Sequence, residues 1–162
     1  MVAYPTDLST TKYLNSWRSK MYKTSYQRRK HSLEAIKFFT EHLFKRNKRL
    51  ASNLTINLKF RDLGDAWGIC DPLDVNTRPR EFTILIDRKL EGKDIIQTIA
   101  HEMVHVWQYA TGKLKNYDAP VCRYEGHLYD ADMSYRDMPW EIEARRLERL
   151  LYKLYVKSQS VR

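Results

Sequence analysis

Cysteine is scarce and long apolar runs are absent. Among 162 residues the only cysteines are Cys70 and Cys122, which lie far apart and lack Cys-x-x-Cys spacing. This excludes a disulfide framework and a cysteine zinc ribbon, so we expect two reduced, structural thiols. No stretch reaches the roughly 18 to 20 consecutive apolar residues of a membrane helix, and the first residues lack the apolar centre of a secretion signal. The sequence therefore predicts a soluble cytoplasmic protein without a membrane partner.

Internal repeats and low-complexity tracts are also lacking. The composition of 43% hydrophobic and 30% charged residues is typical of one globular domain, which we assign to residues 1–162. Residues 1–31 form a basic leading segment with interleaved aromatic side chains. We expect this segment to dock on the core; the alternative is that its aromatic and basic side chains bind bases and phosphates.

Acidic residues are few in the first third of the chain, and the net charge of +9 arises there. Residues 1–50 hold 12 Lys and Arg against 3 Asp and Glu, whereas residues 51–162 hold 17 of each kind. Such an asymmetry indicates a basic surface for a polyanion, above all DNA, although a solvated helix surface would give the same counts. The candidate nucleic-acid contacts are Arg28, Arg29, Lys30, Lys45, Arg46, Lys48 and Arg49.

Apolar spacing predicts an amphipathic helix over residues 32–48. Its core-facing side chains would be Leu33, Ile36, Phe39 and Leu43.

Three strands are predicted after this helix. Residues 54–61 alternate apolar and polar side chains, residues 65–74 run into a turn at Asp71-Pro72, and residues 81–87 are rich in β-branched side chains, so each segment predicts a strand of one small sheet.

Two later helices are predicted from their end signals. Asp94 as N-cap opens a helix that runs to Thr111 and stops at Gly112. Pro139 suits the first position of a last helix, in which apolar residues repeat on one face. The residues between these two helices predict an irregular stretch, of the kind that often carries function.

Residues 98–107, TIAHEMVHVW, hold two histidines four positions apart. On an α-helix such residues lie one above the other, so the ring nitrogens of His101 and His105 can converge on one ion. Glu102 is turned about 100° from His101, where it can hydrogen-bond a water molecule and act as a general base. The pattern also arises by chance, but its uncharged, unbroken helical flanks favour zinc. The opposite face carries apolar residues for the core: Ile95, Ile99, Met103 and Val106.

The segment TIAHEMVHVWQYATGKL followed by PWEIEA resembles the SprT-like zinc metallopeptidases, especially short phage-encoded members. The resemblance implies an α+β class and a minimal zincin-like fold. In that fold a sheet of three to four strands packs on an N-terminal helix, the active-site helix and a C-terminal helix. It also implies one Zn²⁺ ion, and the host cytoplasm as location if the protein is phage-encoded.

A catalytic zinc needs three protein ligands and one open position. Glu141 resembles, by its Glu-x-x-Ala placement, the third ligand of glutamate-type zincins, although Arg145 stands where those families usually carry an acid. His127 would instead restore the three-histidine set of SprT itself, and Glu143 is a further alternative. The third ligand is therefore open among these residues, with Glu141 preferred.

The implied function is zinc-dependent endopeptidase activity on protein or peptide substrates, including DNA-associated proteins. Glu102 would be the general base, and Tyr135 or Tyr129 would stabilise the oxyanion. The substrate would add as a strand along residues 81–87. The alternative function is a nucleic-acid-binding module in which a zincin scaffold keeps a structural zinc.

Overall fold

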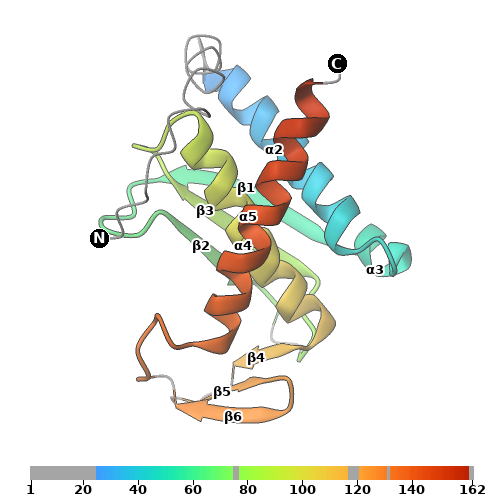
Figure 1. Cartoon of the computed structure of the whole chain (residues 1–162), viewed down its shortest axis with the longest axis vertical. Helices are drawn as coiled ribbons and strands as arrows, with labels where there is room; N and C mark the ends of the chain where they lie inside the picture. The colour runs from blue at the N-terminus through green and yellow to red at the C-terminus, as the bar shows by residue number, and fades with distance from the viewer. Residues whose placement is uncertain (1–24, 75–76, 117–120, 131, 161–162) are drawn as a thin grey trace.

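The computed structural model describes residues 25–74, 77–116, 121–130 and 132–160 (Figure 1). The expected docking of the leading segment falls mainly on residues outside these ranges. The elements in chain order are α2 (Ser25–Leu43), α3 (Lys48–Ser52), β1 (Thr55–Arg61), β2 (Gly68–Pro72), β3 (Glu81–Asp87), α4 (Lys93–Thr111), β4 (Leu114–Asn116), β5 (Val121–Tyr124), β6 (His127–Asp130) and α5 (Pro139–Ser160). The class is α+β, as predicted.

The first sheet has the strand order β1-β3-β2, with β1 parallel and β2 antiparallel to β3. The expectation that a substrate adds as a strand along residues 81–87 is therefore wrong, because β3 is the central strand and is already paired on both sides. The physical reason is visible in β3 itself, because consecutive residues from Phe82 to Ile84 are buried, and burial on both faces is typical of a central strand. The edge beside α4 belongs to β2, which also packs against that helix.

Helix α4 lies at the centre of the molecule, between the first sheet and the helices α2 and α5 (Figure 1). Its core face is the predicted one: Ile95, Ile99, Met103 and Val106 are all fully buried. The helix ends at Gly112 in a left-handed conformation, as predicted, whereas its N-cap is Gly92 rather than Asp94. Asp94 lies inside the first turn, where its charge still favours the helix dipole.

Helix α2 begins at Ser25 instead of residue 32, and its buried face is shifted from the predicted one. Leu33 is 43% exposed, whereas Ile36 and Phe39 are buried beside the small side chains of Ser32 and Ala35. The buried face of α2 therefore runs through Ser32 and Ala35 as well as Ile36 and Phe39. The apolar spacing alone could not reveal this, because Ser32 does not count as apolar.

The described residues between α4 and α5 are not irregular as predicted: strands β4, β5 and β6 form a second, antiparallel three-stranded sheet in the order β4-β5-β6. It lies beneath the C-terminal end of α4 and the start of α5 (Figure 1). The turn between β5 and β6 is Glu125-Gly126, and both residues have positive φ, 48° and 89°. Two such residues make a tight hairpin. The strands are only three or four residues long, too short for alternation to show.

Candidate metal centre

Three potential ligands meet between α4 and the first turn of α5. The Nε2 atoms of His101 and His105 are 3.2 Å apart. The carboxylate of Glu141 straddles them: its Oε2 lies 3.2 Å from Nε2 of His101, and its Oε1 lies 3.2 Å from Nε2 of His105. The structure thus brings together the two histidines and the preferred third residue, and they form the one group of potential metal ligands within the described ranges.

These separations suit a small ion. A tetrahedral zinc ion with bonds of about 2.0 Å has its ligand atoms about 3.3 Å apart, close to each of the three observed distances. The Oε2 atom of Glu141 is also buried and lacks a hydrogen bond of normal geometry to any described residue. A buried carboxylate oxygen without such a partner is costly, and a cation between the three groups would satisfy it. The residues therefore fit a zinc ion.

Each histidine is oriented through its other ring nitrogen. Nδ1 of His101 lies 3.2 Å from Oε2 of Glu148, and Nδ1 of His105 lies 2.8 Å from Oε1 of Gln108. Because both partners are acceptors, the Nδ1 atoms act as donors, and in neutral rings the Nε2 lone pairs point at the shared position. Hydrogen bonds of this kind fix the tautomer and increase the basicity of metal-ligating histidines.

Gln108 is itself held by the start of α5. Its amide nitrogen donates to the carbonyl oxygen of Trp140 at 2.9 Å and to Oε2 of Glu143 at 3.0 Å. Glu143 also accepts from the Tyr124 hydroxyl and forms an ion pair with Lys113. Glu143 is thus engaged in a supporting network that joins α4, α5 and the second sheet, and it is not part of the ligand group.

Glu102 is buried, with 5% of its surface exposed, and lies against the edge strand β2. A Cβ atom added at Gly68 would be only 2.6 Å from Oε1 of Glu102 and 2.6 Å from Cγ2 of Thr98. Glycine at this position therefore lets the carboxylate reach the backbone of β2. Burial raises the pKa of Glu102, and the neighbouring histidines lower it in part. A raised pKa is typical of a carboxylate that exchanges protons near neutrality.

The site favours positive charge between the histidines. Burial alone would lower the pKa of His101, but its contacts with Glu141 and Glu148 outweigh burial and raise the pKa to about 10. Burial would likewise raise the pKa of Glu141, but the contacts with His101 and His105 bring it well below its usual range. With Glu102, three carboxylates surround two imidazoles, a charge balance that suits a divalent cation.

The structure separates the remaining candidates. His127 is exposed on β6 and is not brought into the ligand group. Tyr129 packs edge-on against Trp140, with ring centroids 6.0 Å apart. Tyr135 lies next to the site, since it interacts with the Glu141 carboxylate and its own pKa is raised by burial and by that contact. Tyr135 is thus the better placed of the two predicted oxyanion donors, and its role stays a prediction.

The basic candidates divide into two sets. Arg28 donates to the carbonyl oxygens of Asp87 and Arg88 and lies over the ring of Phe60. Arg29 donates to the carbonyl oxygen of Leu58 at 3.0 Å. These two arginines attach α2 to the first sheet rather than pointing to a partner. The others are exposed: Lys30 on α2, and Lys45, Arg46, Lys48 and Arg49 around the turn into α3.

Sequence reasoning missed Glu148, Gln108 and Gly68. Glu148 follows Glu141 by seven residues on α5, and two helical turns place both on one face, so a search for a second acid at this spacing would find it. Gln108 follows His105 by three residues on the same face. Gly68 carries no signal that distinguishes it from other strand glycines, because its importance comes from a contact with a distant helix.

No protein-family model matches the chain, and neither do curated proteins or solved structures. The resemblance to SprT-like peptidases therefore rests on the residues quoted above, and it stays a prediction.

For the peptidase activity that the resemblance implies, Gly68→Ala is expected to lower the rate on the order of a hundredfold, because displacing a general base by about 1 Å would have an effect of that size. The added methyl group would push the carboxylate of Glu102 away from β2. Zinc content should be unchanged, since Gly68 does not contact the ligand group. Steady-state kinetics and elemental analysis on the same sample check both parts. Loss of zinc together with activity would show that the substitution disturbs α4 as a whole, contrary to this expectation.

Glu148→Gln is expected to weaken zinc binding by about 10- to 100-fold, the usual effect of removing a partner of a ligating histidine. The charge on Oε2 that orients His101 is lost, while the side-chain volume is kept. Competition against a chelating indicator measures the affinity. Glu91→Gln, an exposed carboxylate just before α4, is the control and should bind zinc like wild type. Equal affinity in all three proteins would contradict the assignment of Glu148.

Proposed function

We propose that the protein is a zinc-dependent endopeptidase whose zinc ion is held by His101, His105 and Glu141. The observation that carries the proposal is the buried carboxylate of Glu102 beside the three-residue group. A structural zinc has no use for a proton acceptor next to it. This favours catalysis over the alternative of a nucleic-acid-binding module with a structural metal.

In this proposal Glu102 accepts a proton from the water molecule that attacks the peptide carbonyl carbon. When the carbon–nitrogen bond breaks, Glu102 returns the proton to the leaving amine nitrogen. A zinc ion supplies Lewis acidity, which polarises the carbonyl and acidifies water. Tyr135, half-exposed beside Glu141, would donate a hydrogen bond to the oxyanion. Glu148 and Gln108 keep the histidine rings oriented.

The substrate would lie along β2 as an added strand. An extended peptide can pair with the backbone groups of an exposed edge strand, and β2 is the antiparallel edge of the first sheet. Gly68 places the Glu102 carboxylate directly against this strand. A peptide paired with β2 would therefore pass the proton acceptor.

Both cysteines are free thiols, as we expect for a protein that acts in the cytoplasm. None of the described helices is long and apolar enough to cross a membrane.

Zinc content and cleavage of an unfolded protein substrate together test this proposal. After dialysis we expect about one zinc per chain. Cleavage of denatured casein should stop with a zinc chelator and return when zinc is added back. A dialysed protein that contains no zinc and takes none up would overturn the proposal. Zinc-independent cleavage would instead indicate a contaminating or different activity.

A further inference from the structure

The backbone pairing of β2 with β3 extends one residue beyond each end of β2. The amide of Asp87 donates to the carbonyl oxygen of Trp67, and the amide of Leu73 donates to that of Glu81, both at 2.9 Å. In an antiparallel ladder alternate residues bond to the partner strand, so the odd-numbered residues from 67 to 73 bond to β3. The backbone groups of the residues between them point to the outer edge of the sheet. These residues are Gly68, Cys70 and Pro72, and no described strand pairs with them on that side.

Large apolar side chains cover the face of β2 that points away from α4. Gly68 faces α4, because a Cβ atom at this position would be 2.6 Å from Oε1 of Glu102. Successive side chains of a strand alternate between the two faces of the sheet, so Trp67, Ile69 and Leu73 point away from α4. They are 56%, 42% and 50% exposed. We call these three side chains the apolar row of β2.

The opposite edge of the same sheet has a different character. β1 exposes polar and charged side chains, namely Thr55, Asn57, Lys59 and Arg61. Charged side chains, lysine above all, are the usual means by which an edge strand discourages the addition of another strand. β2 carries no lysine or arginine, and its exposed face holds one charge, Asp71. Strand addition is therefore disfavoured at β1 and open at β2, as far as Pro72, which has no amide hydrogen to donate.

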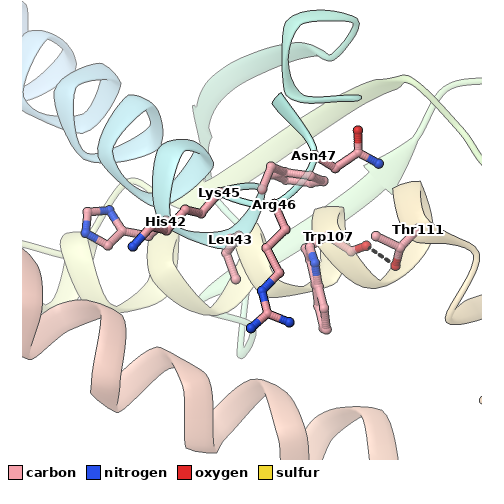
Figure 2. Close-up of a pocket in the computed structure, with 8 residues that line it drawn as sticks. His42, Leu43, Lys45, Arg46, Asn47, Trp107 and Thr111 are labelled. Atoms are coloured by element: carbon pink, nitrogen blue, oxygen red, sulfur yellow. Dashed lines mark hydrogen bonds between the residues drawn. The ribbon is translucent and has the colours of Figure 1, made fainter. Parts of the chain in front are cut away.

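A hollow of about 430 Å³ lies at the C-terminal end of α4 (Figure 2). It is lined by residues 42–47, at the end of α2 and in the turn that follows, and by Trp107 and Thr111 of α4. None of these residues belongs to β2 or to the ligand group. The side chains of a peptide on β2 would therefore meet β2 itself rather than this hollow.

We propose that the apolar row of β2 selects peptide substrates that carry large apolar side chains at alternate positions. The inference rests on the proposed function, because the selected peptide is the substrate added along β2. An antiparallel strand that bonds to Gly68 and Cys70 forms non-hydrogen-bonded pairs at Trp67 and Ile69, with Cα atoms only about 4.5 Å apart. Side chains are closest in such pairs, so Trp67 and Ile69 contact every second side chain of the peptide.

The remaining side chains of such a peptide point towards α4 and the candidate metal centre. The apolar row therefore selects through side chains on the face away from the chemistry, and Glu102 meets the other face. Alternation of apolar and polar residues is typical of half-buried β-strands. The substrate class is thus the β-strand segment of an unfolded protein, in which these residues are no longer buried.

Peptide binding in the presence of a zinc chelator tests the selection without cleavage. One labelled peptide carries two isoleucines two positions apart, and a second peptide of equal composition carries them side by side, so that only one can face the apolar row. A cross-strand pair contributes about 1.4- to 5-fold in affinity, and we expect fluorescence anisotropy to show a preference of that size for the first peptide.

Trp67→Thr/Ile69→Thr should remove this preference, because threonine keeps the strand propensity but not the apolar contact. The affinity for the first peptide should fall by about 2- to 25-fold, the effect of two pairs. The matched control is Leu128→Thr/Leu150→Gln, which changes two other exposed apolar side chains, on β6 and α5. It should bind both peptides like wild type.

Cleavage of a peptide library by the zinc-loaded protein tests whether the specificity can be changed. Ile69→Lys should shift the preference at one position from apolar to acidic, because opposite charges on facing strands attract. Leu128→Lys should cleave the same peptides as wild type. With a single preferred peptide, Ile69→Thr should raise KM and leave kcat unchanged, since the contact is equal in the bound substrate and in the transition state.

The outcomes separate this inference from the proposed function. Equal affinity of wild type for the two peptides, or a preference that survives in Trp67→Thr/Ile69→Thr, would overturn the selection even if zinc-dependent cleavage is observed. A preference that the double variant loses, without any cleavage by the zinc-loaded protein, would support the apolar row as a peptide-binding surface and remove the peptidase. A dimer of wild type that the double variant dissociates, with no preference between the peptides, would assign the row to a contact between two copies and overturn the proposal.

Discussion

Glu102→Gln is expected to lower the rate of peptide hydrolysis by about 10²- to 10⁴-fold, the contribution of a general base, while zinc content stays at the wild-type level. The amide has the shape of the carboxylate but cannot accept the proton of the attacking water. Glu102 is not one of the three residues whose donor atoms lie 3.2 Å apart, so the ion should remain bound. Kinetics on a peptide substrate and elemental analysis of the same preparation measure the two quantities.

The same substitution should not reduce stability. Burial raises the pKa of Glu102, which means that folding disfavours its ionised form at neutral pH. A neutral amide avoids the burial of a charge, so the unfolding midpoint of Glu102→Gln should equal or exceed that of wild type. If Glu102→Gln gains stability while it loses activity, Glu102 contributes to catalysis at the expense of the stability of the fold. Full activity with zinc bound would end the proposal that Glu102 is the base.

The sequence predicted those parts of the site that lie on one helix. His101, Glu102 and His105 are fixed relative to one another by helical geometry, so their spacing alone placed them correctly. Their carboxylate neighbour from α5 could be proposed only through a resemblance, because no local pattern tells which distant helix will pack on α4. Gly68 was beyond reach for the same reason: its contact with Glu102 joins two segments that are far apart in the chain.

The fold shows the same division. Strand β1 was predicted from its apolar alternation, β3 from its β-branched residues, and helices α4 and α5 from the residues at their ends, and all of these signals are local. The position of β3 within the sheet was mispredicted. Its segment EFTILID has consecutive residues that are buried, and such an unbroken run is typical of a strand that is covered on both faces. Periodicity also failed for β4 to β6, because strands of three or four residues give too few positions to test an alternation. There the two-residue turn at Glu125-Gly126 was the stronger signal.

Glu141→Ala is expected to abolish zinc retention through dialysis and to lower zinc affinity by more than about 100-fold, since even a partner outside the ligand set is worth 10- to 100-fold. Glu141 is buried, and each of its oxygens lies 3.2 Å from one histidine nitrogen. Without it, two imidazoles remain, and two ligands do not complete a zinc site of the catalytic type. Elemental analysis and chelator competition measure the loss.

Two matched variants make this result specific to the third ligand. His127→Ala removes the rival from an exposed position on β6 and should leave zinc binding at the wild-type level. Glu143→Ala removes the support of Gln108 and should weaken binding by no more than about 100-fold, as expected for an indirect contact. The expected order of loss is therefore Glu141, then Glu143, then His127. Zinc retained in Glu141→Ala but lost in His127→Ala would require the hairpin of β5 and β6 to reach the site, and the ligand set would then be three histidines.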